Sequence, residues 1–316
     1  MLETSMTTKN SNQPEQSDAW LEWLLRHRHG SDPEYAQVIR TTVESYAQRV
    51  IEGARLRPGM TMLDVGTGDG LVAFRAIDQV GPSLKAILTD ISAPLLQHTE
   101  QLAHERGIAQ QCTFIQASAE LLSSIENDSV DAVTTRSSFA YVRNKVSAMR
   151  EFSRTLRPGG RLSMAEPVLR DDGIATIALR QKLDALPSDS TNRILPLIHR
   201  WKAAQYPDTL EKLEASEITN YSERDLIKVA KICGFTELKL ELHISMLPSR
   251  PVSWEVFLAT SPHPLAPCLK DILARDFSVD ERELFESAVR PRVETLDTLS
   301  TDRMAYLTAT KPMTKK

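Results

Sequence analysis

Apolar and polar residues follow two different periods along the chain, and together they predict helices packed on strands. Between Met60 and Pro167, short apolar runs of strand length are separated by segments whose apolar residues recur three or four positions apart. Strands that alternate with helices of this length form parallel pairs through right-handed crossovers. The pattern predicts a doubly wound α/β core over 60–167. Its strands are expected at 60–66, 85–91, 112–118, 130–138 and 161–167, with helices at 71–80, 93–107 and 145–156.

Helical periodicity also occurs on both sides of this core. In 18–59, apolar residues from Val38 to Ala54 fall on one helical face, and a Pro-Gly pair at 58–59 ends the helix, which predicts an N-terminal helical cap. Residues 168–221 contain helical stretches without a strand pattern. We therefore expect a helical insertion there.

Residues 222–316 are predicted to complete the core. Two capping boxes, Ser222 with Asp225 and Ser278 with Glu281, begin helices in this region. The remaining elements expected here are strands over 236–247 and 304–312 and a second helical insertion at about 263–292.

Composition and charge exclude several classes of protein. The 316 residues are 41% hydrophobic and 25% charged, as in a folded domain. Lys and Arg number 38 against 42 Asp and Glu, a net charge of −4, so we expect no nucleic-acid partner. The polar segment 1–17 predicts a disordered tail rather than a signal peptide, and no apolar run is long enough to span a membrane. These features predict a cytoplasmic protein without a membrane partner.

The chemistry-bearing motif is Leu-Asp-Val-Gly-Thr-Gly-Asp-Gly at 63–70, between a predicted strand and a predicted helix. Its glycines allow a sharp turn and a close backbone approach to a ligand. A dinucleotide fingerprint needs Gly-x-Gly-x-x-Gly, and here the third glycine comes one position early, which argues against NAD. Asp90 lies twenty residues beyond Gly70 at the end of the next strand, where a carboxylate can accept both hydroxyls of a ribose. As an alternative, the turn is a packing device and Asp90 a helix cap.

With these motifs the sequence resembles the class I S-adenosylmethionine-dependent methyltransferases, and within them the small-molecule group similar to ubiquinone/menaquinone C-methyltransferases. The resemblance implies a Rossmann-like sheet, mostly parallel with an antiparallel C-terminal strand. It also implies S-adenosyl-L-methionine as cofactor, a small-molecule substrate, and a substrate cap built from 168–221. The matching segments are 63–70, 89–92, 114–122, 131–142 and 156–167.

The resemblance assigns cofactor roles to the glycine-rich loop. Gly66, Thr67, Gly68 and Gly70 pass under the methionine part of the cofactor, and Asp64 faces its ammonium group directly or through water.

Further cofactor contacts are implied at the ends of the next three strands. Asp90 holds the ribose and Ile91 lies against the adenine face. Ser118 stands where many relatives have an Asp that accepts from the adenine amine, with Ala119 beside it. Arg136 is expected near the cofactor carboxylate or the substrate.

Four residues are candidates for catalysis because their segments can reach the same edge of the sheet. Tyr141 could orient a substrate or pack the loop, and Glu166 could act as a base or cap a helix. His29 belongs to the basic cluster 26–29, which could bind an anion or be a solvated helix end. His199 could line a substrate cap or be an ordinary surface or core histidine.

Three other functions and one assembly remain open at this level. A regulatory protein could bind the cofactor without transferring a methyl group, and a nicotinamide-dependent reductase would use a similar core. A thiol-dependent arsenic methyltransferase would need clustered cysteines, whereas Cys112, Cys233 and Cys268 are widely spaced and predict no metal site. A homodimer is left open as the assembly.

Overall fold

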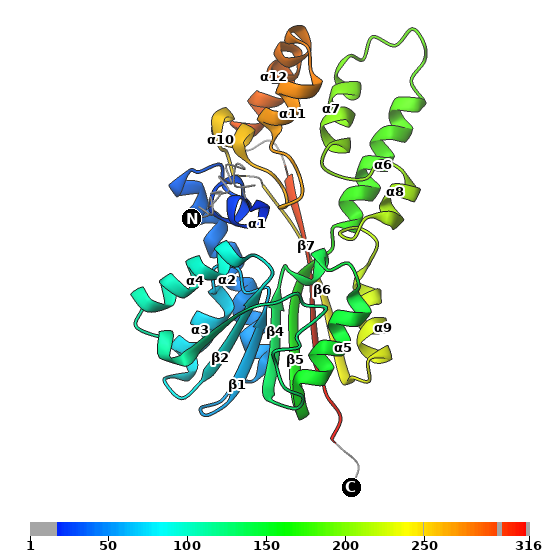
Figure 1. Ribbon diagram of the computed structural model, residues 1–316. Coiled ribbons are helices and arrows are strands. Elements are labelled where there is room, and N and C mark those ends of the chain that lie inside the picture. Colours follow the sequence, from blue (N-terminus) through cyan, green and yellow to red (C-terminus); the bar gives the residue numbers. More distant parts are fainter. Residues whose placement is uncertain (1–17, 249, 296–298, 314–316) are drawn as a thin grey trace, which may run out of the picture.

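The fold is built on a single seven-stranded sheet with the order β3-β2-β1-β4-β5-β7-β6 (Figure 1). A computed structural model describes residues 18–248, 250–295 and 299–313. Strands β1 to β5 run parallel, and β7 lies antiparallel between β5 and β6. This mixed sheet confirms the predicted Rossmann-like fold. The strands are β1 (Thr61–Val65), β2 (Lys85–Asp90), β3 (Cys112–Gln116), β4 (Val130–Arg136), β5 (Leu156–Pro167), β6 (Thr236–Pro248) and β7 (Leu299–Thr310).

Amphipathic helices cover both faces of the sheet. On one face, buried residues of α2 such as Val50 pack with Phe74 of α3 and Met62 of β1. On the other face, Phe152 of α5 and Leu226 of α9 pack in a second cluster against β4 and β5. Burial of these apolar stripes is the main driving force for the layered arrangement. The helices are α2 (Pro33–Ala54), α3 (Leu71–Val80), α4 (Ala93–Glu105), α5 (Lys145–Thr155) and α9 (Glu223–Ile232).

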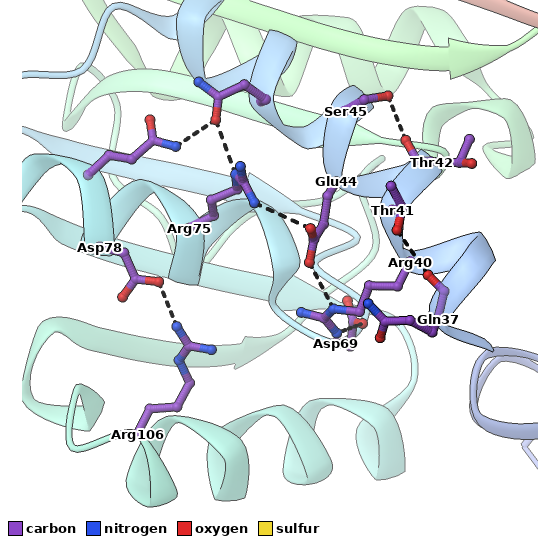
Figure 2. Close-up of polar contacts among 12 residues, drawn as sticks. Gln37, Arg40, Thr41, Thr42, Glu44, Ser45, Asp69, Arg75, Asp78 and Arg106 are labelled. Atoms are coloured by element: carbon purple, nitrogen blue, oxygen red, sulfur yellow. Dashed lines mark hydrogen bonds and ion pairs between the residues drawn. The ribbon is translucent and has the colours of Figure 1, made fainter. Parts of the chain in front are cut away.

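Ion pairs lie on the outer surface of the helical layer formed by α2, α3 and α4 (Figure 2). Glu44 of α2 accepts a hydrogen bond from Arg40 at 3.0 Å and pairs with Arg75 of α3 at 3.6 Å. Arg106, just after α4, pairs with Asp78 of α3 at 2.6 Å. Exposed pairs of this kind contribute only about 0–1 kcal/mol each. Helix α2 therefore has its polar face outward and its apolar face buried against the sheet. Within the predicted cap 18–59, the part that lies outside this core layer is the chain before α2.

Two helical groups are added at one end of the strands (Figure 1). They share a third apolar cluster in which Leu197 and Trp201 of the first group meet Trp254 and Phe285 of the second. The second group begins at Trp254, earlier than the predicted start near residue 263. The added helices are α6 (Arg170–Asp184), α7 (Ile194–Ala203), α8 (Leu210–Ala215), α10 (Trp254–Ala259), α11 (Leu269–Asp276) and α12 (Val279–Val293).

Local signals place most element ends correctly. Both predicted capping boxes are present at the starts of α9 and α12. Strand β5 begins at Leu156, earlier than predicted, because its first residue already pairs with Val130 across a register shift. The tail predicted over 1–17 lies outside the described residues. Among the helices of the described chain, none is long and apolar enough to cross a membrane.

Candidate functional site

A cavity of about 310 Å³ opens at the carboxyl ends of β1, β2, β3 and β4. Open α/β sheets bind ligands at this edge. The cavity brings together seven of the ten residues predicted to bind the cofactor, whereas Asp64, Thr67 and Gly70 do not line it. The seven are Gly66, Gly68, Asp90, Ile91, Ser118, Ala119 and Arg136.

The glycines of the loop after β1 have different structural duties. Gly66 has a φ of +65°, and a Cβ there would lie 2.4 Å from the Cβ of Ser138. Gly68 has a φ of +59°, and a Cβ there would have only the Leu24 side chain within 4 Å, at 3.7 Å. Its backbone is therefore open to the cavity. Gly70 is the N-cap of α3, where a Cβ would strike the ring of Phe74. The close backbone approach expected of the loop is therefore available at Gly66 and Gly68.

Asp64 lies under the loop rather than in the cavity. Its carboxylate accepts hydrogen bonds from the hydroxyls of Thr67 at 2.8 Å and Thr134 at 2.7 Å. Burial raises its pKa to about 6, against the opposite effect of these two hydrogen bonds. Asp64 and Thr67 thus hold the loop from below, and the predicted contact of Asp64 with an ammonium group stays a prediction.

Asp90 connects the ends of β1 and β2. One carboxylate oxygen accepts from the Gly68 backbone N–H at 3.0 Å, and the other accepts from the Ser92 N–H at 3.0 Å. Burial raises the pKa of this carboxyl group. Two oxygens have about four acceptor positions, so Asp90 can still accept from hydroxyls in the cavity. The adjacent Ile91 is 58% exposed and provides an apolar surface beside it.

Two further polar groups line the cavity at the ends of β3 and β4. The Ser118 hydroxyl oxygen accepts from the Glu120 N–H at 3.2 Å, which leaves its own O–H free to donate. The Nε atom of Arg136 is buried and has no acceptor among the described residues. A buried guanidinium N–H without an acceptor is costly, so this position suits an anionic ligand.

The cover of the cavity comes from the first described residues of the chain, α1 (Ala19–Glu22) and the π-helix η1 (Trp23–His27). Trp20, Trp23, Leu24 and Arg28 line the cavity. The first three are not among the residues predicted from the sequence, although their spacing gives a short helix an apolar face with no local partner. Arg28 is the one member of the basic cluster 26–29 that reaches the cavity.

The second helical group holds this cover in place. The Trp23 indole N–H donates to the Ser261 carbonyl at 3.1 Å, and the Ser261 N–H donates to the His27 carbonyl at 2.9 Å. Gly30 lies so close to Val256 that a Cβ would come within 2.6 Å of its carbonyl oxygen. The segment after α10 therefore closes the site together with the N-terminal residues.

Arg28 and Arg136 bring two guanidinium groups to one cavity. Burial, together with the positive charge of Arg136, lowers the pKa of Arg28 to about 10, and Asp69 partly opposes this shift. Neither arginine has a carboxylate within ion-pair distance in the described part of the chain. The cavity thus combines apolar walls, a carboxylate that can accept from ligand hydroxyls, and two guanidinium groups.

Comparison with known proteins identifies the domain. A family model described as a methyltransferase domain matches residues 56–217. The chain belongs to this methyltransferase family. Its members include the class I S-adenosylmethionine-dependent enzymes that the sequence resembles, so the predicted resemblance is confirmed.

Individual relatives match part of the chain rather than the whole of it. A ubiquinone/menaquinone biosynthesis C-methyltransferase of Hahella chejuensis is 37% identical over 37% of this chain and 46% of its own. A nocamycin O-methyltransferase of Saccharothrix syringae is 30% identical over 48% of this chain and 55% of its own. The chain thus spans about half the length of the curated relatives it matches.

A solved structure has the same fold. It comes from Bacillus halodurans and is described as that of a candidate methyltransferase. It has a TM-score of 0.51, is 18% identical, and covers 85% of this chain and 100% of its own.

Of the four catalytic candidates, only Tyr141 lines the cavity of the methyltransferase domain. Its ring packs edge-on against Trp20 with centroids 5.1 Å apart, and burial raises its pKa well above the ordinary tyrosine range. Glu166 lies beneath the same turn, where its carboxylate accepts from the Thr135 hydroxyl at 2.9 Å and the Ala140 N–H at 3.2 Å. Burial raises the pKa of Glu166 to about 7. Glu166 therefore contacts the turn that carries Tyr141, not the cavity.

The two histidine candidates lie elsewhere. His29 does not line the cavity, and its buried Nδ1 has no partner among the described residues. His199 lies 3.3 Å from Asp208 and borders a separate surface depression with Arg275.

The cysteines are also dispersed. None of the three lines the cavity, and burial raises the pKa of Cys112 and Cys268 to about 11. Burial raises that of Cys233 as well. Among the described residues, no group of three or more His, Cys, Asp or Glu is placed to hold a metal ion. The geometry offers no support for an arsenic-binding thiol cluster.

Proposed function

We propose that this protein is an S-adenosylmethionine-dependent methyltransferase that acts on a small molecule. One observation carries the proposal: a single cavity at the carboxyl edge of the sheet is lined by Gly68, Asp90, Ile91 and Arg136. A nucleoside with an attached amino acid needs an open backbone, hydroxyl acceptors, an apolar surface and a cation, and this cavity supplies each of them.

The residues have separate roles in the proposal. The carboxylate of Asp90 accepts from the ribose hydroxyls, Ile91 covers the adenine, and the Ser118 hydroxyl with Ala119 borders the adenine edge. The unpartnered Nε–H of Arg136 donates to the carboxylate of the methionine part. Gly66 and Gly68 pass beneath that part of the cofactor.

When bound, the cofactor supplies an electrophilic methyl group for an oxygen, nitrogen or carbon nucleophile. The protein then has to position the acceptor and exclude water, which can account for several kcal/mol of the barrier. Trp20, Trp23 and Leu24 form an apolar cover suited to this task. Tyr141 stays protonated because burial raises its pKa, so it acts as a donor that orients the acceptor. Glu166 is a positioning residue for the Tyr141 turn.

The names of two relatives support a small-molecule acceptor, but they differ in the atom that is methylated. One is named as a C-methyltransferase and the other as an O-methyltransferase. The cap regions 18–32, 168–221 and 254–293 are added to the sheet and its covering helices, and they are proposed to select the acceptor.

Calorimetric titration with S-adenosylhomocysteine tests the cofactor assignment. Incubation with methyl-labelled S-adenosylmethionine and a metabolite extract of the host, followed by mass spectrometry, tests transfer. Binding and a labelled product are expected. Binding without any product would favour a regulatory protein that uses the same cavity, and absence of binding would contradict the proposal. Binding of NADPH instead would favour a reductase.

Location and assembly are part of the proposal as well. We infer a cytoplasmic protein that works without nucleic acid or membrane, with a homodimer as the assembly to test. Light scattering on the purified protein distinguishes a dimer from a monomer, and cell fractionation tests the location.

A further inference from the structure

A second cavity, of about 390 Å³, lies directly beyond the proposed cofactor site. Trp23 and Arg28 line both cavities, which therefore adjoin at these two side chains. The rest of the second cavity comes from α2, the end of α7 and the segment around α10, which converge there with η1. The second cavity is therefore built mainly from the cap regions.

Aromatic rings form much of its wall. Trp23, Tyr35, Trp201 and Phe257 all line it. Trp201 packs edge-on against Phe257 with centroids 5.8 Å apart, and on its other side against Phe285 at 5.6 Å. Rings held by such packing keep their orientation, and they favour flat apolar ligands over flexible polar ones.

Two cations line the same space. Lys202 lies with its Nζ 3.9 Å from the centre of the Trp201 ring, and the Arg28 guanidinium lies 5.4 Å from that of Trp23. Within the described ranges, neither cation has a carboxylate at ion-pair distance.

The surroundings do not neutralise these charges. Asp172 raises the pKa of Lys202 and Asp69 raises that of Arg28, but in each case desolvation by burial is the larger effect, and both pKa values are lowered. The indole N–H of Trp201 is likewise buried without an acceptor among the described residues. Buried cations and donors of this kind are stabilised by an anion that enters the cavity.

We propose that the second cavity binds the methyl acceptor, and that the acceptor is a flat aromatic molecule with a carboxylate or another anionic group directed at Lys202 and Arg28. The inference rests on the proposed function, because the two cavities adjoin at Trp23 and Arg28 and an acceptor in the second cavity would lie next to the methyl donor in the first. Rings of the wall hold the aromatic part, and the two cations set its orientation.

The test uses 2-naphthoate as the probe, titrated calorimetrically into the full chain saturated with S-adenosylhomocysteine. The neutral isostere 2-naphthamide and the non-aromatic anion cyclohexanecarboxylate are titrated in the same way. We expect naphthoate to bind at least roughly tenfold more tightly than either, equivalent to about 1.4 kcal/mol. Equal affinities, or no naphthoate binding up to about 5 mM, would overturn the proposal.

Variants then locate the binding. Lys202→Met should weaken naphthoate roughly tenfold while leaving naphthamide and S-adenosylhomocysteine unchanged. Lys202→Arg, which keeps the charge, should retain most of the affinity. Lys228→Met, on the exposed side of α9, is the matched control and should have no effect. If Lys202→Met bound naphthoate as the parent does, the anion site would be wrong.

The design separates the two proposals. Loss of S-adenosylhomocysteine binding in the parent protein would contradict the proposed function, whatever naphthoate does. Normal S-adenosylhomocysteine binding without discrimination among the three probes would contradict only the acceptor site. If Lys202→Met failed to bind S-adenosylhomocysteine because it did not fold, Lys202→Gln with the same three probes would replace it, and an unchanged preference for naphthoate would again overturn the proposal.

Discussion

The indole N–H of Trp23 donates a hydrogen bond to the carbonyl oxygen of Ser261, across 238 positions of the chain. This contact joins the cover of the cofactor cavity to the segment after α10. Replacing Trp23 with Phe keeps an aromatic ring but leaves the Ser261 carbonyl without this donor. We expect the free energy of unfolding to fall by about 1 kcal/mol, and hydrogen exchange to accelerate at Ser261, whose own N–H donates to His27.

Trp20→Phe is the matched control, because Trp20 lines the same cavity through ring packing against Tyr141. It should leave exchange at Ser261 unchanged. Equal exchange rates in the two variants would show that the Trp23 hydrogen bond does not hold the cover.

Asp90→Asn tests the ribose assignment. The amide replaces one carboxylate oxygen by a donor, so it cannot accept from the Gly68 N–H and from ligand hydroxyls as the carboxylate does. The affinity for S-adenosylhomocysteine should fall roughly 10- to 100-fold, as for loss of hydrogen bonds to a charged group.

Asp78→Asn provides the comparison for Asp90→Asn. Asp78 also carries a paired carboxylate, but on the outer surface of α3 beside Arg106 (Figure 2). The Asp78→Asn variant should bind S-adenosylhomocysteine with the same affinity as the parent protein. A similar loss in both variants would point to a general charge effect and against a ribose contact.

The stability of the protein should depend on the protonation of Glu166. Burial raises its pKa from the ordinary value of 4.5 to about 7, so the folded state holds the proton more tightly than the unfolded chain does. The stability that this proton contributes is fully present below pH 4.5 and is lost as the pH rises to about 7. Glu166→Gln removes the titration, so urea unfolding of the variant should vary less with pH across this window. An unchanged slope would show that Glu166 is ionised throughout it.

Gly66→Ala should destabilise the fold through the loop itself. The new Cβ would lie 2.4 Å from the Cβ of Ser138, which is fixed because its hydroxyl donates to the Val65 carbonyl. Gly107→Ala is the control, since its φ of +70° is similar and no atom lies within 4 Å of the new Cβ. The backbone strain shared by both is about 1 kcal/mol, and the clash should cost Gly66→Ala about 1–3 kcal/mol more by thermal or urea unfolding. Equal losses would mean that Ser138 moves aside freely.

Short-range rules in the amino-acid sequence are enough to predict the core elements and the glycine-rich loop. The alternation of apolar runs with helical periods defines β1 to β5 and their helices, because each element is specified by residues within about 15 positions of one another. The glycine-rich turn and the position of Asp90 follow from the same rules, since the carboxyl ends of neighbouring parallel strands meet at one edge of a sheet. Both capping boxes are equally local.

Which side chains share a cavity depends on long-range packing, which local patterns do not specify. Asp64 carries a strong motif signal, yet it accepts hydrogen bonds from Thr67 and Thr134 and is not among the residues that line the cavity. Trp23 and Lys202 carry weak local signals, yet the docking of the N-terminal segment and α7 against the α10 region brings both to the second cavity. Such contacts join residues far apart in the chain, and a helical period specifies that a face is buried without specifying against what. The cover and the second cavity are therefore products of packing between the cap regions.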